Sequence, residues 1–286
     1  MPKFVYSPPY QLHVPSYYGG TISSLHRLSS LLLLSGFGRI RDNNGELIKL
    51  STDFMSVPCQ NATKFKVTNL INKIPNCSAS EFRYFIKNSA LKNIDIHENI
   101  FREISHCLAH YENKRYISSF LHLYRLIEHA ALYLPLVVIV AKGVNNLTFN
   151  QYKEVIDNKA KADLSVLKKF SVDVLNQNIG NSNARYSFSS TSNPTGYVHI
   201  LTGLLENPQQ VVSSGPGYVE VKYKHTDRLI VNFRNQFFHY LYHEKNISLK
   251  QLDDPDEFLS ACLPSFISYF AFLYQELLKA EWELWG

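Results

Sequence analysis

The sequence lacks the patterns that identify several common classes of protein. It has 4 cysteines in 286 residues, and no two of them form a C-x-x-C pair. This spacing provides neither a zinc ribbon nor a redox-active dithiol, and free thiols fit a reducing cytoplasm. The motifs G-x-x-x-x-G-K-[ST], G-x-G-x-x-G and G-x-S-x-G are also absent. Interpretations as an ATPase, a Rossmann dehydrogenase or an α/β-hydrolase therefore lack their usual signatures.

Signals for a membrane or for secretion are also weak. Residues 130–141, A-A-L-Y-L-P-L-V-V-I-V-A, most resemble a membrane span, but a spanning helix needs about 20 apolar residues. We interpret them as a buried core helix. The first residues, M-P-K-F-V-Y-S-P-P-Y, lack the apolar centre of a signal peptide. We therefore expect no membrane association and a cytoplasmic location.

No run of five like charges occurs, so a basic or acidic tail is excluded. The net charge of +5 permits an RNA or phosphate partner without requiring one. Hydrophobic residues make up 45% of the chain, with 18 Tyr and 18 Phe, which is enough for a packed core and excludes global disorder.

Residues 1–94 predict a small N-terminal α+β region of unknown role. A Leu-rich helix over residues 21–35 should end at Gly36, and two short alternating runs flank an Asn-Gly turn, which favours a hairpin. Ser78-x-x-Glu81 predicts a capping box at the start of another helix. A structural or dimerising domain fits this order of elements, and so does a small winged-helix module.

Residues 95–286 predict a mainly α-helical domain. Asp95 and Asp254 are the expected N-caps of its first and last helices. Residues 178–196 and 207–217 are polar and predict loops, whereas residues 218–223 alternate and predict a short strand. We expect helices over residues 95–111, 114–142, 148–177, 197–205, 227–244 and 255–285.

Residues 227–244, D-R-L-I-V-N-F-R-N-Q-F-F-H-Y-L-Y-H-E, place polar groups in an apolar helical pattern. Asn235, His239 and His243 are four residues apart and would share one face, with Arg234 one step round. A cation that never deprotonates, beside an imidazole that titrates near neutrality, suits chemistry on a phosphodiester.

Arg234-Asn235-x-x-x-His239 resembles the R-x4-6-H signature of the HEPN family, whose members are small all-α bundles. The looser match Arg115-x6-His122 lacks the following Asn and lies outside the penultimate predicted helix. The resemblance implies a HEPN-like helical bundle and, by analogy, a metal-independent ribonuclease of a toxin–antitoxin, CRISPR or phage-defence system. It also implies that neither a cofactor nor a metal is needed.

In that family the 2′-hydroxyl of RNA attacks the adjacent phosphorus. The resemblance implies that His239 transfers protons, Arg234 binds the phosphate oxygens, and Asn235 orients the histidine or donates to the phosphate. Because one histidine cannot easily be base and acid at once, such nucleases dimerise, and we expect a homodimer that binds RNA. An antitoxin or activator protein is a possible further partner. The alternative function is a non-catalytic HEPN-like scaffold or sensor that binds nucleotide, RNA or a partner protein.

Two further residues are possible supporting members of this site. His243 is either a second proton carrier or a solvated histidine at a helix end. Glu128 lies among apolar residues, so it needs a partner if it is buried. That partner is Arg234, or alternatively Arg125 or Lys114.

His106-x3-His110, with Glu103 nearby, has the spacing of metal ligands on a helix. A catalytic zinc site needs a third ligand and usually an acid that orients a ligand, and no H-E-x-x-H motif occurs. We therefore expect no metal.

Overall fold

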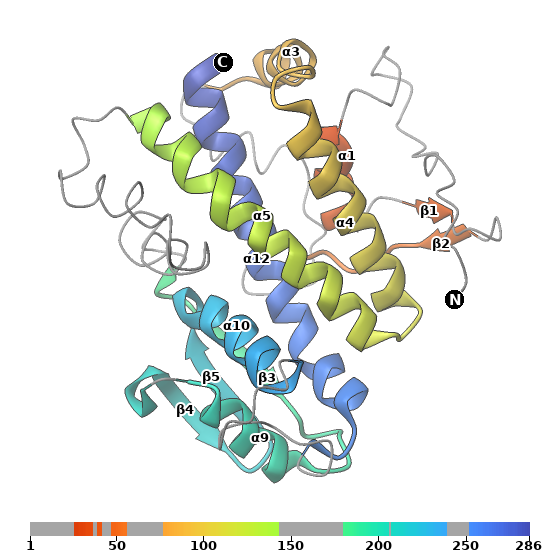
Figure 1. Cartoon of the computed structure of the whole chain (residues 1–286), viewed down its shortest axis with the longest axis vertical. Coiled ribbons are helices and arrows are strands. Elements are labelled where there is room, and N and C mark those ends of the chain that lie inside the picture. The colour runs from red at the N-terminus through yellow and green to blue at the C-terminus, as the bar shows by residue number, and fades with distance from the viewer. Residues whose placement is uncertain are drawn as a thin grey trace.

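The computed structural model describes residues 26–36, 39–41, 47–55, 77–142, 180–205, 207–238 and 252–286. In these ranges the chain is mostly helical with two small antiparallel sheets, so the expected mainly α class is confirmed, and the HEPN-like arrangement stays a prediction (Figure 1). The helices are α1 (His26–Leu34), α3 (Ala79–Asn88), α4 (Ile94–Glu112), α5 (Tyr116–Lys142), α9 (Pro194–Gly203), α10 (Thr226–Phe237) and α12 (Pro255–Trp285). The strands are β1 (Arg39–Arg41), β2 (Leu47–Lys49), β3 (Asn183–Ser187), β4 (Val211–Gly215) and β5 (Tyr218–Lys222).

The long helices α4, α5 and α12 pack side by side and form the centre of the protein, with α5 in contact with both others (Figure 1). Aromatic residues fill the junction with α10, where the ring of Phe120 on α5 lies 5.1 Å from that of Phe233 and 6.3 Å from that of Phe266. All three side chains are fully buried, and burial of this size is a major source of stability. Helix α5 is therefore the element against which the others are positioned.

Helix α12 is the one helix within the described ranges that is long and apolar enough to cross a membrane by length and composition. Of the most apolar 18-residue window of this helix, 72% is buried inside the protein.

The ends of the helices confirm two of the three expected caps. Ser78 and Glu81 form the predicted capping box, and the carboxylate of Asp254 accepts a hydrogen bond from the third residue of α12. The expected cap at Asp95 was wrong. Asn93 occupies the N-cap position with a left-handed φ of 53°, so α4 begins at Ile94. Asn tolerates this conformation better than most residues, a local preference that outweighed the capping tendency of Asp.

The three-stranded sheet, in the order β3-β5-β4, corrects the expectation of two long loops. The strand expected over residues 218–223 is confirmed as β5, but β3 and β4 lie inside stretches expected to be loops. In β3 only Ala184 and Tyr186 are buried, so its inward face carries a single large side chain. Tyr186 packs against α12, with its ring 5.8 Å from that of Phe266. Tertiary contact therefore stabilises a strand whose polar composition predicts a loop.

The described part of the N-terminal region packs on the long helices. Helix α1 lies against α4, and its apolar residues belong to the same buried core as those of α5 and α12. The predicted stop at Gly36 is confirmed, with φ of 72° and room for no side chain, since a Cβ would lie 2.8 Å from the carbonyl oxygen of Thr52. The predicted hairpin is confirmed as the antiparallel pair β1 and β2.

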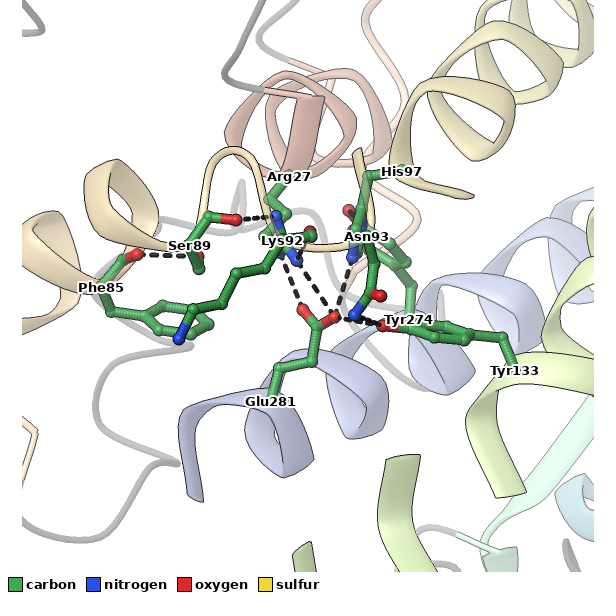
Figure 2. Close-up of polar contacts among 9 residues, drawn as sticks. All are labelled: Arg27, Phe85, Ser89, Lys92, Asn93, His97, Tyr133, Tyr274 and Glu281. Carbon is green, nitrogen blue, oxygen red and sulfur yellow. Dashed lines mark hydrogen bonds and ion pairs between the residues drawn. The ribbon is translucent and has the colours of Figure 1, made fainter. Parts of the chain in front are cut away.

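A buried ionic network joins α1 to α12. The guanidinium of Arg27 donates to both carboxylate oxygens of Glu281, at 2.8 and 3.1 Å (Figure 2). It also donates to the backbone carbonyls of Ser89 and Lys92, each at 2.8 Å. One side chain of α1 thus holds the chain between α3 and α4 as well as the end of α12.

The same carboxylate gathers donors from α4 and α5. The Nε2 atom of His97 lies 2.9 Å from Glu281 and the hydroxyl of Tyr133 donates to it at 2.9 Å (Figure 2). Because a carboxylate only accepts, Nε2 of His97 carries the proton, and Nδ1 accepts from the hydroxyl of Tyr274 at 3.3 Å. Every member is satisfied, as a buried charge requires.

Burial by itself would raise the pKa of Glu281, but the hydrogen bonds and charges of His97 and Arg27 lower that pKa to about 2. Burial lowers the pKa of His97 below its ordinary value, against the raising effect of Glu281. The network therefore holds an ionised carboxylate and a neutral imidazole.

We predict that Arg27→Met lowers the free energy of unfolding by about 3–5 kcal/mol, because it leaves a buried carboxylate without its cation. Arg102→Met is a matched control, since Arg102 pairs with Glu98 at the surface, where such a pair contributes about 0–1 kcal/mol. Urea unfolding of both variants measures the difference. Similar losses in the two variants would contradict this role of the network.

Acid should destabilise the protein in two stages. The unfolded chain protonates His97 below its ordinary pKa of 6.5 and Glu281 below 4.5, whereas the folded network resists both protons. Stability is therefore full above about pH 6.5 and falls with acidification, by up to about 1.4 kcal/mol per pH unit for one proton. His97→Gln keeps a donor to Glu281 and removes the first titration. Between about pH 7 and about pH 5 the urea midpoint of this variant should fall less than that of wild type. An equal fall in both proteins would contradict the assignment of the first stage to His97.

Candidate functional site

Helix α10 carries Asn235 opposite its buried face and Arg234 at the edge of that face. Leu229, Ile230 and Phe233 are fully buried against the core, whereas Arg234 is half-buried and Asn235 is exposed. The start of the helix at Thr226 agrees with the prediction to within one residue, and its described part ends at Phe237. Arg234 therefore lies in the last described turn, where the negative end of the helix dipole favours a cation.

The guanidinium of Arg234 is held from two sides. Its Cζ atom lies 4.9 Å from the centre of the Tyr124 ring on α5, which is a cation–π distance. Its Nη1 group donates to Oδ1 of Asn235 at 3.2 Å. Tyr124 is 6% exposed and cannot move away, so it fixes the plane against which the guanidinium rests.

Glu128 lies one helical turn after Tyr124 on α5, near enough for its carboxylate to affect the pKa of the Tyr124 hydroxyl. Burial raises the pKa of Tyr124, the charge of Arg234 opposes this effect, and Glu128 adds to it. Glu128 is exposed, so the condition under which it would need a buried partner does not apply. Its apolar sequence neighbours face the core, whereas the carboxylate points outward.

The structure thus brings Arg234, Asn235 and Glu128 to one surface, with Tyr124 between the guanidinium and the carboxylate. His239 and His243 lie outside the described residues, and His239 follows directly after Phe238, the last described residue of this stretch. Tyr124 was not identified from the sequence, because nothing local links a tyrosine on one helix to an arginine 110 residues later.

A second polar cluster lies where α4 meets α5. His106 and His110 on α4 and His122 on α5 each offer a nitrogen, and these atoms lie within 4.8 Å of one another. The ring of His122 stacks on both others, with centroid distances of 4.9 Å to His106 and 5.4 Å to His110. Glu103 accepts from Nδ1 of His122 at 2.7 Å. A third histidine, which the sequence did not reveal, and Glu103, a carboxylate that can orient it, are therefore both present.

The sequence does contain a signal for this cluster. A tight turn with Lys114 at a positive φ of 56° joins α4 to α5, and His106 and His122 both lie eight residues from it. In an antiparallel helical hairpin, residues equidistant from the turn lie opposite one another. Pairing histidines across the predicted turn would have identified His122.

Burial, with smaller contributions from the charges of His122, His106 and Arg115, lowers the pKa of His110 to about 4. Burial also lowers the pKa of His106. Burial raises the pKa of Glu103, but His122 and Arg125 outweigh it, and the net shift is downward. The cluster therefore presents neutral imidazoles of His106 and His110 beside an ionised carboxylate near pH 7.

A cleft of about 350 Å³ lies between β3, the segment after it and α12, and none of the expected site residues lines it. Arg185 is the one charged residue in its lining, and it is engaged with Glu220 and the ring of Tyr218. The remaining lining residues are uncharged, and most of them carry hydroxyl groups. The cleft therefore offers no general base among the residues that line it.

No protein-family model, no curated protein and no solved structure matches this chain. The likeness to the HEPN family accordingly rests on Arg234, Asn235 and His239 and on the helical composition.

We predict that Arg234 and Tyr124 are coupled by about 0.5–1 kcal/mol in the free energy of unfolding. A double-mutant cycle with Arg234→Met and Tyr124→Leu measures this coupling. The same cycle with Tyr124→Phe should retain it, because the ring remains and only the hydroxyl is lost. A coupling near zero in the Leu cycle would show that the guanidinium does not rest on the ring in solution.

Proposed function

We propose that the protein is a metal-independent endoribonuclease that acts in prokaryotic defence or as a growth-arresting toxin. The observation that carries the proposal is the placement of Arg234, whose half-buried guanidinium lies against Tyr124 in the last described turn of α10. His239, the other member of the motif, follows this turn in the sequence.

A fixed guanidinium suits the transition state of phosphodiester cleavage. Negative charge grows on the non-bridging oxygens as the phosphorus is attacked, and the planar fork of arginine can bind two of them. A cation already held in place by a ring and an amide loses little freedom when the substrate binds. Arg234 keeps further N–H donors beyond the one given to Asn235.

The proposed reaction transfers two protons. A base removes the proton of the 2′-hydroxyl, this oxygen attacks the phosphorus, and the 5′-oxygen leaves with a proton from an acid. The products are a 2′,3′-cyclic phosphate and a 5′-hydroxyl. His239 serves as base or acid, and the copy from a second chain supplies the other, which is why we propose a homodimer. His243 is the candidate for an additional proton carrier.

Glu128 has a positioning role in this proposal. Its carboxylate lies near the hydroxyl of Tyr124, and in this proposal it helps to orient the ring against which Arg234 rests. RNA is the proposed partner, in keeping with a net charge of +5. An antitoxin or activator that controls the cleavage, and a cytoplasmic location, belong to the same proposal.

The test is cleavage of total RNA and tRNA by the purified protein in EDTA. We expect wild type to cut, His239→Ala to be inactive, and Arg234→Lys to be slower by about 100-fold, because an ammonium group lacks the planar fork. His199→Ala is the matched control, since His199 is exposed on α9, away from this surface, and should cut like wild type. The ends should be cyclic phosphates.

Equal cleavage by wild type and His239→Ala would contradict the proposal, and absence of cleavage by wild type would contradict a nuclease that acts without an activator. Either result favours the non-catalytic module, for which His239→Ala should leave RNA or partner binding unchanged. Sedimentation of each variant shows whether it keeps the oligomeric state of wild type, which separates loss of chemistry from loss of assembly.

A further inference from the structure

We propose that His106, His110 and His122 bind one Zn²⁺ ion per chain and leave a fourth coordination position open to water. The site lies between α4 and α5 and is separate from the surface formed by Arg234 and Tyr124. Successive residues of a helix are about 100° apart, so His122 and Tyr124 leave α5 in nearly opposite directions.

The backbone already places the three ligands. His106 and His110 are four residues apart and share one face of α4, and His122 reaches them from the next helix. Nitrogens bound to a tetrahedral zinc ion at about 2.0–2.1 Å lie about 3.4 Å apart. The observed limit of 4.8 Å is wider, and the ring of His122 stacks on the other two, so the half-buried rings must rotate out of the stack and their nitrogens must approach by about an ångström or more when the ion binds.

Glu103 completes a pattern that is common around bound zinc. Its Oε2 atom accepts from Nδ1 of His122 at 2.7 Å, which fixes the proton on Nδ1 and leaves the lone pair on Nε2 for a metal. Arg125 lies 3.6 Å from the other oxygen of Glu103. Carboxylate–histidine–zinc arrangements of this kind orient the ligand and increase its basicity.

The donors select the class of ion. Three imidazole nitrogens suit zinc and its neighbours among the transition metals, whereas Mg²⁺ and Ca²⁺ prefer oxygen. Three protein ligands with an open fourth position are typical of catalytic zinc, and structural zinc has four protein ligands. Because the histidines are only half-buried, water can reach the fourth position.

Packing alone accounts less well for the cluster. Three adjacent imidazoles repel one another when protonated, and a helical hairpin can pack with apolar residues at such positions. A divalent cation would use three imidazole nitrogens that already lie within 4.8 Å of one another, and it would use the tautomer that Glu103 favours in His122.

The first test is titration of the metal-stripped full chain with Zn²⁺ against a chromophoric chelator. We expect one ion per chain. His110→Ala should weaken binding by about 100-fold or more, and Glu103→Gln by about 10- to 100-fold, because it removes the carboxylate that orients His122. His199→Ala should bind like wild type. Binding by wild type no tighter than by His110→Ala would overturn the proposal. Circular dichroism without metal checks that the variants fold.

Cobalt substitution of wild type tests the site without any mutation. Co²⁺ in a four-coordinate imidazole site absorbs visible light strongly, and azide should change the spectrum if the fourth position is open. A weak, octahedral-type spectrum identical to that of free Co²⁺ would overturn the proposal.

The zinc site and the proposed nuclease can fail independently. RNA cleavage that persists in EDTA leaves zinc binding to be decided by titration alone. Cleavage that is lost in EDTA and in His110→Ala, but kept in His239→Ala, would support the zinc site and contradict the metal-independent mechanism.

Discussion

The buried carboxylate of Glu281 is the constraint on which the rest of the structure depends. An ion in an apolar interior is tolerated only when several donors surround it, and here they are Arg27 on α1, His97 on α4 and Tyr133 on α5. The requirement sets how far α12 extends beside its neighbours. It also holds the start of α4 against α5, and the same two helices carry the histidine cluster nearer their shared turn.

Local signals in the sequence predicted most of the helices. The helix boundaries at Ser78, Asp254 and Gly36 were predictable because the effect of each residue acts within one turn of the backbone. The strands β3 and β4 were missed because their polar residues alternate with few large apolar ones, and contact with β5 and α12 decides their conformation. The ionic network was also beyond prediction, since Arg27 and Glu281 are 254 residues apart.

The same distinction between local signals and contacts of distant elements applies to the candidate site residues. Arg234 and Asn235 were found as a short motif on one helix, and the structure places them together. Tyr124 and His122 were missed because each acts across a contact between helices. For His122 the information was present as equal distances from the turn at Lys114, whereas for Tyr124 no simple symmetry relates α5 to α10.

The two polar clusters differ in the charge they are suited to receive. The guanidinium of Arg234 is a permanent cation that rests on the ring of Tyr124, an arrangement suited to an anionic phosphate. Around His122 burial and crowding disfavour protonation of His106 and His110, an arrangement suited to a cation. Because Tyr124 and His122 leave α5 on opposite sides, a ligand at one cluster need not displace a ligand at the other. A phosphodiester substrate and a zinc ion would therefore bind on opposite sides of α5, which is the rigid element between them.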